Sequence, residues 1–323
     1  MRALVLLVIV LTACTTTPNA ATSPTPSPTA SATATATQTP TSSPTPSPTP
    51  ISLPSIAQLS APSGTVVWAL VAGTRLFRSS DRGDTWVERS LAVRLANVEV
   101  AFADDTNGLL LNPDSPPTSC QIQIWKTTDG AGTWQLLAPT GIADARCKAG
   151  FASGDITHAF LTGSTPTDPA IVYRTADGGS TWQASGPLAG RSAAVYNVPG
   201  RPRAFGAIVL LDATPAGQSR AVFRSQDSGA TFGLVSAAPL VEAPVAFVTQ
   251  TRWLQLGPPG GSMETTDGGA TWHAYTTDYS QAAPVAPQIV FGDTSVGYAT
   301  VRGSIQRTTD GGAHWTAIKT PGT

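Results

Sequence analysis

From residue 55 onward, short apolar runs alternate with clusters of Gly, Asp and Ser, and the runs have the length of β-strands. The last unit contains the four runs PQIVFGD, VGYATV, SIQRTTD and HWTAIK. An earlier unit contains VEVAFAD, GLLLN, QIWKTTD and TWQLLA in the same order. No apolar stripe at i, i+3 and i+4 runs long enough for a globular helix. Each unit is therefore predicted to be a sheet of four antiparallel strands.

A nine-residue motif recurs once in each unit. Every copy has a Ser or Thr two residues before an Asp, a Gly-rich pair after it and an aromatic residue at its end. The copies are RSSDRGDTW (78–86), KTTDGAGTW (126–134), RTADGGSTW (174–182), RSQDSGATF (224–232), ETTDGGATW (264–272) and RTTDGGAHW (307–315). The Asp residues are Asp81, Asp129, Asp177, Asp227, Asp267 and Asp310, at steps of 48, 48, 50, 40 and 43 residues. A period of 40–50 residues is that of a propeller blade.

The repeat predicts an all-β protein with a six-bladed β-propeller, in which the motif forms the turn between the third and fourth strands. Seven blades are the alternative, but they would need about 38 residues each, and no interval has room for four more strands. The run SIAQLSA (55–61) is the only candidate for the inner strand of the first blade. The ring is expected to close without an N-terminal strand in the last sheet.

The motif resembles the Asp-box, or BNR, repeat of sialidase-type propellers, S/T-x-D-x-G-x-T-W. Two copies depart from it: TTDGAGTW has its glycines displaced by one place, which could give that turn a different conformation, and SQDSGATF ends in Phe. The resemblance assigns a structural role to the six Asp residues and to the aromatic residues, which are Trp86, Trp134, Trp182, Phe232, Trp272 and Trp315.

The residue types explain that role. An Asp carboxylate can accept hydrogen bonds from backbone N–H groups one or two residues ahead, and the following Gly permits positive φ. The aromatic residue is expected to begin the fourth strand and to pack between neighbouring blades. One Asp per blade is spread around the rim, so the six cannot converge on one substrate.

The last unit also resembles blades of the photosystem II assembly and stability factor family, through Asp293, Gly297 and Tyr298 ahead of the Asp-box turn. That resemblance implies a scaffold or assembly protein. The basic surface with which that family binds partners has no match in the sequence, so no photosynthetic role is inferred. Trp68, Trp253 and Tyr298 share one place in the second strands and are expected to pack between blades.

The N-terminus differs from the rest of the chain. Residues 1–14 place an apolar run, too short to span a membrane, before LTAC, which resembles a bacterial lipobox. We therefore expect a signal peptide and lipidation of Cys14. Residues 15–52 are rich in Thr, Ser and Pro and are expected to form a disordered linker, with glycosylation left open. Residues 53–323 are expected to form the propeller.

Charge and cysteine content fit an exported protein. The formal net charge is −1, and no basic stripe suggests a nucleic-acid partner. Cys120 and Cys147 remain after Cys14, and we expect them to form a disulfide worth about 3–4 kcal/mol in the chain-entropy model. The three His residues, His158, His273 and His314, are scattered. No metal site and no cofactor is expected.

Catalytic residues are not evident. A sialidase needs an arginine cluster, a Tyr–Glu pair and an acidic proton shuttle, but RPR at 201–203 is a poor match to the sialidase RIP motif. Of the four Glu residues, only Glu99 and Glu242 lie away from the Asp-box turns, and neither is near a Tyr in sequence. We expect no enzyme activity, although a glycoside hydrolase that uses an Asp pair stays open.

Two hypotheses follow. The first is a monomeric, lipid-anchored, non-catalytic binding or scaffold protein, exported to the cell membrane or surface of a bacterium, with a protein or glycan partner. Its ligand-binding residues are unknown, and the longer loops at 112–120, 163–170 and 212–219 are the candidate region. The second is a sialidase-like or other glycoside hydrolase. Three convergent Arg and a Tyr–Glu contact would favour the second, and an open, uncharged face would favour the first.

Overall fold

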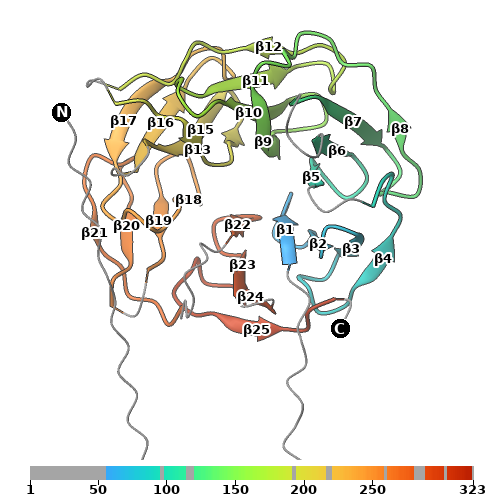
Figure 1. Ribbon diagram of the computed structural model, residues 1–323. Coiled ribbons are helices and arrows are strands. Elements are labelled where there is room, and N and C mark those ends of the chain that lie inside the picture. The colour runs from blue at the N-terminus through green and yellow to red at the C-terminus, as the bar shows by residue number, and fades with distance from the viewer. Residues whose placement is uncertain are drawn as a thin grey trace, which may run out of the picture. The chain divides into compact units, whose positions relative to one another are not determined.

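A computed structural model of the protein describes residues 56–94, 98–113, 120–190, 194–215, 220–257, 260–279, 288–301 and 304–321. These residues belong to the unit Ile51–Thr323. Their strands form six sheets arranged as a ring, with the first strand of each sheet near the centre and the last at the periphery (Figure 1). The predicted six-bladed, all-β propeller is confirmed. The described residues contain no helix long and apolar enough to cross a membrane.

Six sheets of at least four strands follow one another along the chain. The first three blades consist of β1 (Ile56–Ser60), β2 (Val67–Val71), β3 (Arg75–Ser79) and β4 (Val87–Arg89); β5 (Glu99–Phe102), β6 (Gly108–Pro113), β7 (Ile122–Thr127) and β8 (Gln135–Leu136); and β9 (Cys147–Ser153), β10 (Ala159–Ser164), β11 (Ile171–Thr175) and β12 (Gln183–Ala184). The last three consist of β13 (Val198–Pro199), β14 (Arg203–Phe205), β15 (Ile208–Thr214), β16 (Ala221–Ser225) and β17 (Gly233–Ala237); β18 (Ala246–Phe247), β19 (Trp253–Gln255), β20 (Met263–Thr265) and β21 (His273–Ala274); and β22 (Ile289–Phe291), β23 (Gly297–Val301), β24 (Ser304–Thr308) and β25 (Thr316–Ile318).

Each blade is an antiparallel meander in chain order. β1 pairs with β2, with Leu59 opposite Ala69, so the run at 55–61 does supply the inner strand of the first blade. The sixth sheet, β22-β23-β24-β25, is complete without an N-terminal strand. The fourth blade departs from the pattern, because two short strands, β13 and β14, together pair with β15. This interruption shapes the centre of the ring, as described below.

The hydrophobic core lies between neighbouring blades. Trp68, Trp253 and Tyr298 on the second strands are all fully buried, and Trp68 stacks on Phe102 of the second blade with ring centroids 3.6 Å apart. A single cluster joins Leu59 and Val67 of the first blade to Ile305 of the sixth. Apolar packing between blades therefore continues across the point where the ring closes.

Candidate functional site

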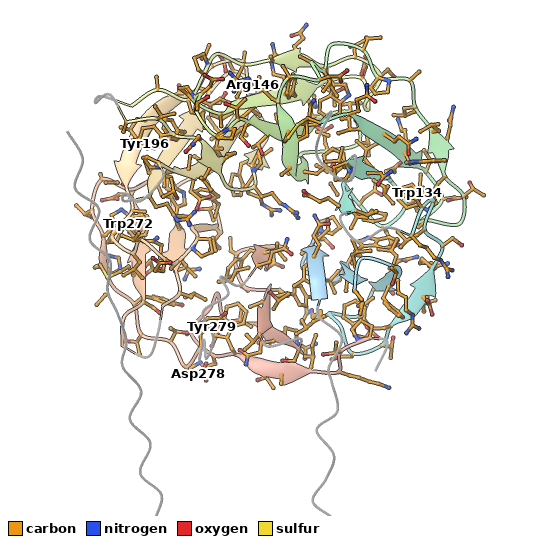
Figure 2. All side chains as sticks on the ribbon, in the orientation of Figure 1. Trp134, Arg146, Tyr196, Trp272, Asp278 and Tyr279 are labelled. Atoms are coloured by element: carbon orange, nitrogen blue, oxygen red, sulfur yellow. A yellow bond between two sulfur atoms is a disulfide. The ribbon has the colours of Figure 1, made fainter. Side chains whose placement is uncertain are left out.

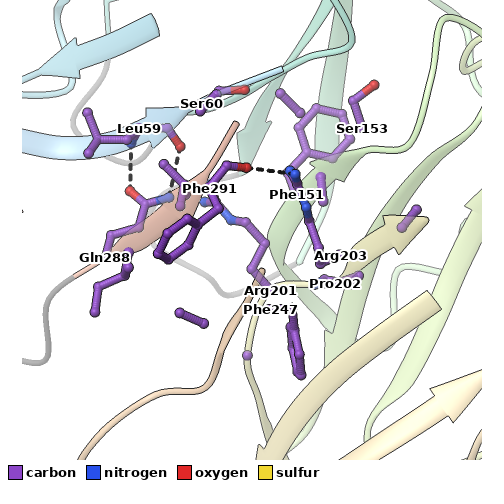
Figure 3. A pocket seen from close by; sticks show the side chains of 18 of the residues that line it. Leu59, Ser60, Phe151, Ser153, Arg201, Pro202, Arg203, Phe247, Gln288 and Phe291 are labelled. Carbon is purple, nitrogen blue, oxygen red and sulfur yellow. Dashed lines mark hydrogen bonds between the residues drawn. The ribbon is translucent and has the colours of Figure 1, made fainter. Parts of the chain in front are cut away.

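A central cavity of about 540 Å³ lies among the inner strands. Its wall comes from every blade and consists of residues 59–62, 100–103, 151–154, 200–204, 244–247 and 288–291, together with Asp212 and Arg220. Figure 3 shows this cavity with Arg201 and Arg203 beside Phe291 and Gln288. A volume of this size is typical of sites for small molecules, so the cavity is the candidate functional site.

At three of the junctions around the cavity, a polar side chain from the inner edge of one blade bonds to the inner strand of the next. Gln58 Oε1 accepts a hydrogen bond from Val100 N at 2.6 Å, and Gln288 Oε1 accepts one from Leu59 N at 2.6 Å. Glu99 accepts bonds from Gly150 N at 3.2 Å and Phe151 N at 2.9 Å. Inner strands are sheet edges, whose outward N–H groups need partners. The three side chains meet that need and hold the wall of the cavity in place.

The fourth blade brings two arginines into the cavity. Pro199 pairs with Ala213 and Arg203 pairs with Leu210, so three residues of the inner strand, Gly200 to Pro202, oppose two residues of β15. One extra residue of this kind is a β-bulge, which redirects side chains, and Pro202 has no N–H to donate. Arg201 lies within the bulge and Arg203 directly follows it.

The two arginines reach the inner strands of other blades. Arg201 Nη2 donates to Glu99 Oε2 of the second blade at 2.9 Å, and the two side chains are 28% and 20% exposed. Arg203 Nη2 donates to the carbonyl oxygen of Phe291 in the sixth blade at 2.7 Å (Figure 3). Burial lowers the pKa of both arginines, and the Glu99 carboxylate opposes that effect only at Arg201. Arg203 has no carboxylate partner among the described residues.

A second ion pair lines the cavity on the same blade. Arg220 Nη1 donates to Asp212 Oδ2, which also accepts a hydrogen bond from Val245 N at 3.2 Å. The Asp212 side chain is only 4% exposed. Its carboxylate occupies space next to Gly200, where any Cβ would collide with it. Asp212 therefore connects the fourth blade to the fifth, as Glu99 connects the second blade to the third.

The chemistry of the cavity differs from both sequence-based expectations. Three arginines gather there, so the face is not uncharged, and the segment RPR, rejected as a catalytic motif, supplies two of them. No Tyr lies among the described residues that line the cavity. Asp212 is the one acid among the described lining residues, Glu99 lies beside the wall through its bond to Arg201, and Glu242 is not in the wall. Both Asp212 and Glu99 already accept bonds from guanidinium and backbone donors. Sequence reasoning missed the arginines because their convergence depends on the bulge and on the closure of the ring.

The Asp-box turns lie away from the cavity. The Asp carboxylates accept bonds mainly from the N–H groups three and four residues ahead, a longer reach than expected. Asp81, for example, accepts from Thr85 N at 2.9 Å and from Thr85 Oγ1 at 2.5 Å. Several hydrogen bonds lower the pKa of Asp81 to about 2, and the bond from the Thr85 hydroxyl has the largest effect. The pKa values of the other five, Asp129, Asp177, Asp227, Asp267 and Asp310, are lowered as well.

The displaced glycines of the second turn do not change its conformation. Ala131 has a φ of 62° at the place where the other five copies have a Gly with positive φ. Its N–H donates to Thr127 Oγ1 at 3.0 Å, as Gly83 N does to Ser79 Oγ at 2.7 Å. A buried Ala is therefore held in the left-handed region by the same contacts as the glycines.

The motif aromatics immediately precede the fourth strands and contact the preceding blade. Trp86 Nε1 donates to Lys319 O, Trp134 Nε1 to Ser90 O and Trp272 Nε1 to Ser236 Oγ, at 3.0, 2.9 and 3.1 Å. Figure 2 labels Trp134 and Trp272 on two different blades. Trp182 and Trp315 are buried, and Phe232 is partly buried against the core of the third and fourth blades.

The two propeller cysteines, Cys120 and Cys147, are joined by a disulfide bond. Lys148, next in sequence, donates from Nζ to Cys120 O at 2.9 Å and also to Ala143 O. Burial lowers the pKa of this amine. The disulfide bond connects Cys120, two residues before β7, to Cys147, the first residue of β9. It therefore links the second blade to the third.

Several expected features lie outside the described residues. These are the signal peptide at 1–14 with Cys14, the linker at 15–52, and residues 114–119 and 216–219 of the loops at 112–120 and 212–219. The loop at 163–170 is described and contains a Thr165–Asp168 hydrogen bond of 3.0 Å. Among the residues that the structure describes, no three His, Cys, Asp or Glu side chains gather as metal ligands.

No protein-family model and no curated protein matches the chain in sequence. Solved structures match its fold. AofleA from Arthrobotrys oligospora is 14% identical, with a TM-score of 0.56 over 83% of this chain and 88% of that one. YCF48 bound to D1 peptide is 16% identical, with a TM-score of 0.50 over 83% and 81%. A GH74 enzyme from Niastella koreensis is 16% identical, with a TM-score of 0.49 over 80% of this chain and 46% of that one. At these identities the likeness concerns the fold alone.

Proposed function

We propose that this chain is a non-catalytic binding protein of the bacterial cell envelope, that a lipid on Cys14 anchors it to the membrane, and that the central cavity is its ligand site. The observation that carries the proposal is the state of two acids, Asp212 in the cavity wall and Glu99 beside it. Glu99 is bonded to Arg201 and to two backbone N–H groups, and Asp212 is bonded to Arg220 and Val245 N. Both acids are thus already engaged in bonds that hold the wall together.

Glycoside hydrolysis would need at least one of these carboxylates to act on the substrate instead of on the wall. A glycosidase pair consists of an acid that gives a proton to the leaving group and a second carboxylate that attacks or activates water. Here the Glu99 carboxylate already accepts bonds from Arg201 and two backbone N–H groups, and Asp212 Oδ2 accepts bonds from Arg220 and Val245 N, so both are committed to contacts within the protein. The geometry therefore favours retention of a ligand over its hydrolysis.

Two further points support a binding role. YCF48 was solved with D1 peptide, so a propeller of similar fold holds a partner. The apolar run that ends at Cys14 and the Thr/Ser/Pro-rich segment at 15–52 would place such a propeller outside the cell on an extended tether. The partner in the envelope would be a protein or a glycan.

Native mass spectrometry of the whole chain in detergent tests this function. The chain is incubated with a soluble extract of the cell envelope and then freed of excess extract. We expect a bound compound whose mass equals that of a compound in the untreated extract. Cleavage products that accumulate with time, and not in an extract without the protein, would contradict the proposal and favour the hydrolase.

A further inference from the structure

Arg203 is a cation inside the cavity without a matching anion. Of its donor atoms, Nη2 is bonded to Phe291 O at 2.7 Å, and Nε is buried without a hydrogen-bond partner among the described residues. Its guanidinium carbon lies 5.5 Å from the centre of the Phe205 ring. Arg203 is partly buried, and a charge that is partly removed from water is normally paired with a counter-ion. The other two cavity arginines follow that rule and Arg203 does not.

The charges of the wall do not balance. Arg201 faces Glu99 and Arg220 faces Asp212, so each of those pairs is neutral. Arg203 then leaves one positive charge in the described part of the wall. A ligand with a single negative charge would compensate it, whereas a dianion would leave an excess negative charge in the cavity.

Backbone carbonyl oxygens on the inner strands could accept hydrogen bonds from a ligand. On an antiparallel edge strand, the N–H and C=O of one residue point the same way. The outward N–H groups of Val100 and Phe102 are bonded to Gln58 and Ser60. The carbonyl oxygens of these two residues therefore also face outward from their sheet, and they are acceptors. Hydroxyl groups of a ligand would donate to such oxygens.

We infer that the cavity binds a small hydroxylated monoanion, and that Arg203 is the residue that pairs with its carboxylate or sulfate group. This inference rests on the proposed function, because it specifies the ligand of the same site. The guanidinium fork suits a planar carboxylate, and a sulfate ester offers the same single charge. The volume of about 540 Å³ is sufficient for a sugar-sized body.

Isothermal titration calorimetry of the whole chain in detergent tests the inference with three probes, D-glucuronate, glucose 6-sulfate and D-glucose. We expect the charged probes to bind and D-glucose not to bind. Preference for glucuronate or for the sulfate identifies which anion the site takes, and either preference supports the inference. Equal binding of D-glucose would overturn it, as would no binding of either charged probe at millimolar concentration.

The matched variants are R203Q and R224Q, which remove one charge each from the fourth blade. Arg224 is on β16 and does not line the cavity. R203Q should weaken binding of the preferred anion by about tenfold or more, because a charge-assisted hydrogen bond is lost, and R224Q should bind like the unmodified chain. Equal affinity in R203Q and the unmodified chain would contradict the role of Arg203.

Salt provides a measurement that needs no variant. Raising the NaCl concentration should weaken binding of the charged probe to the unmodified chain, and affinity that does not change with salt would count against a charge pair. The two proposals also fail separately. An uncharged envelope compound retained unchanged by both R203Q and the unmodified chain would remove the anion inference and leave the binding function standing.

Discussion

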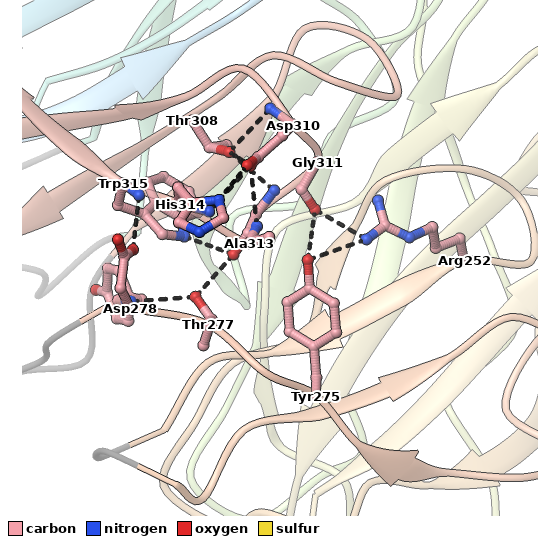
Figure 4. Close-up of polar contacts among 12 residues, drawn as sticks. Arg252, Tyr275, Thr277, Asp278, Thr308, Asp310, Gly311, Ala313, His314 and Trp315 are labelled. Atoms are coloured by element: carbon pink, nitrogen blue, oxygen red, sulfur yellow. Dashed lines mark hydrogen bonds and ion pairs between the residues drawn. The ribbon is translucent and has the colours of Figure 1, made fainter.

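Arg252 Nη2 donates to the carbonyl oxygen of Gly311 at 2.8 Å and so joins the fifth blade to the Asp-box turn of the sixth (Figure 4). Arg307 makes the equivalent bond from the sixth blade to Arg82 O of the first, at 2.7 Å. Arg307 is the first residue of its motif, but that place in the fifth blade is occupied by Glu264. Arg252 replaces the missing cation and also pairs with Glu264 at 2.7 Å.

The substitution Arg252→Ala should therefore destabilise the ring. It removes a bond between blades and leaves Glu264, which is 12% exposed, with His273 at 3.0 Å as its one remaining ion-pair partner among the described residues. The expected loss is about 1–3 kcal/mol in the free energy of unfolding, measured by urea denaturation. Arg224→Ala is the control, because no ion pair of Arg224 occurs among the described residues. A loss of the same size in both variants would show that the Arg252 contact is not specific.

Gly269→Ala should destabilise the fifth Asp-box turn. Gly269 has a φ of 87°, and a Cβ there would lie 2.6 Å from both the Trp253 ring and the Ser236 side chain. Positive φ and the clash together should cost about 2–3 kcal/mol in thermal or urea unfolding. At Gly233, a Cβ would meet nothing within 4 Å, so Gly233→Ala should change stability by less than about 1 kcal/mol. The prediction fails if the two variants unfold alike.

His314 should make the sixth turn sensitive to pH. His314 replaces the Thr of the other five copies, and its Nδ1 lies 2.6 Å from Asp310 Oδ2 (Figure 4). A hydrogen bond to Asp310, and the charge of that carboxylate, raise the pKa of His314 above its ordinary value of 6.5. The contribution is complete below pH 6.5 and is lost as pH rises through the raised pKa.

At low pH, the stability of the sixth turn is limited by the protonation of Asp310. Burial would raise the pKa of Asp310, but hydrogen bonds from His314 and Thr308 lower it to about 2. Its contribution is therefore present above the ordinary value of 3.8 and is lost as pH falls towards 2. An NMR titration should show His314 with a higher pKa than free histidine, and His314→Thr should remove the alkaline change in stability. An ordinary pKa for His314 would refute the pairing.

Cys14→Ala tests the lipid anchor. If Cys14 carries the lipid, the variant should leave the membrane fraction or stay unprocessed, because the acyl chains that bind the bilayer are absent. Fractionation with a non-ionic detergent and intact mass measurement report both results. Ser42→Ala in the linker is the control and should fractionate like the unmodified chain. A Cys14→Ala protein of mature mass that still partitions with the membrane would rule out this anchor.

The fold could be predicted from the sequence because its determinants are local and repeated. Each Asp-box specifies a turn through contacts within a few residues, and the apolar runs around it specify strands. Even the inner strand at 55–61, which has no motif of its own, could be placed because the first blade needed a fourth strand. The steps between Asp residues then fixed the number of blades.

The cavity could not be predicted because its residues meet only when the ring closes. Arg201 and Glu99 are 102 residues apart in sequence, and Arg203 and Phe291 are 88 apart. No periodicity links them, and the bulge at Gly200–Pro202 is a departure from the repeat. The role of Arg252, which supplies the cation that the fifth motif lacks, could not be predicted from the sequence either. It depends on which strand lies beside Glu264.

The strictest test of the central cavity as a binding site is a crystal structure of the chain with the compound that it retains from the envelope extract. We predict electron density for the intact compound inside the ring, an anionic group beside Arg203, and unbroken Glu99–Arg201 and Asp212–Arg220 pairs. Density for the compound on another face of the propeller, with the cavity filled only by water, would contradict the proposed site.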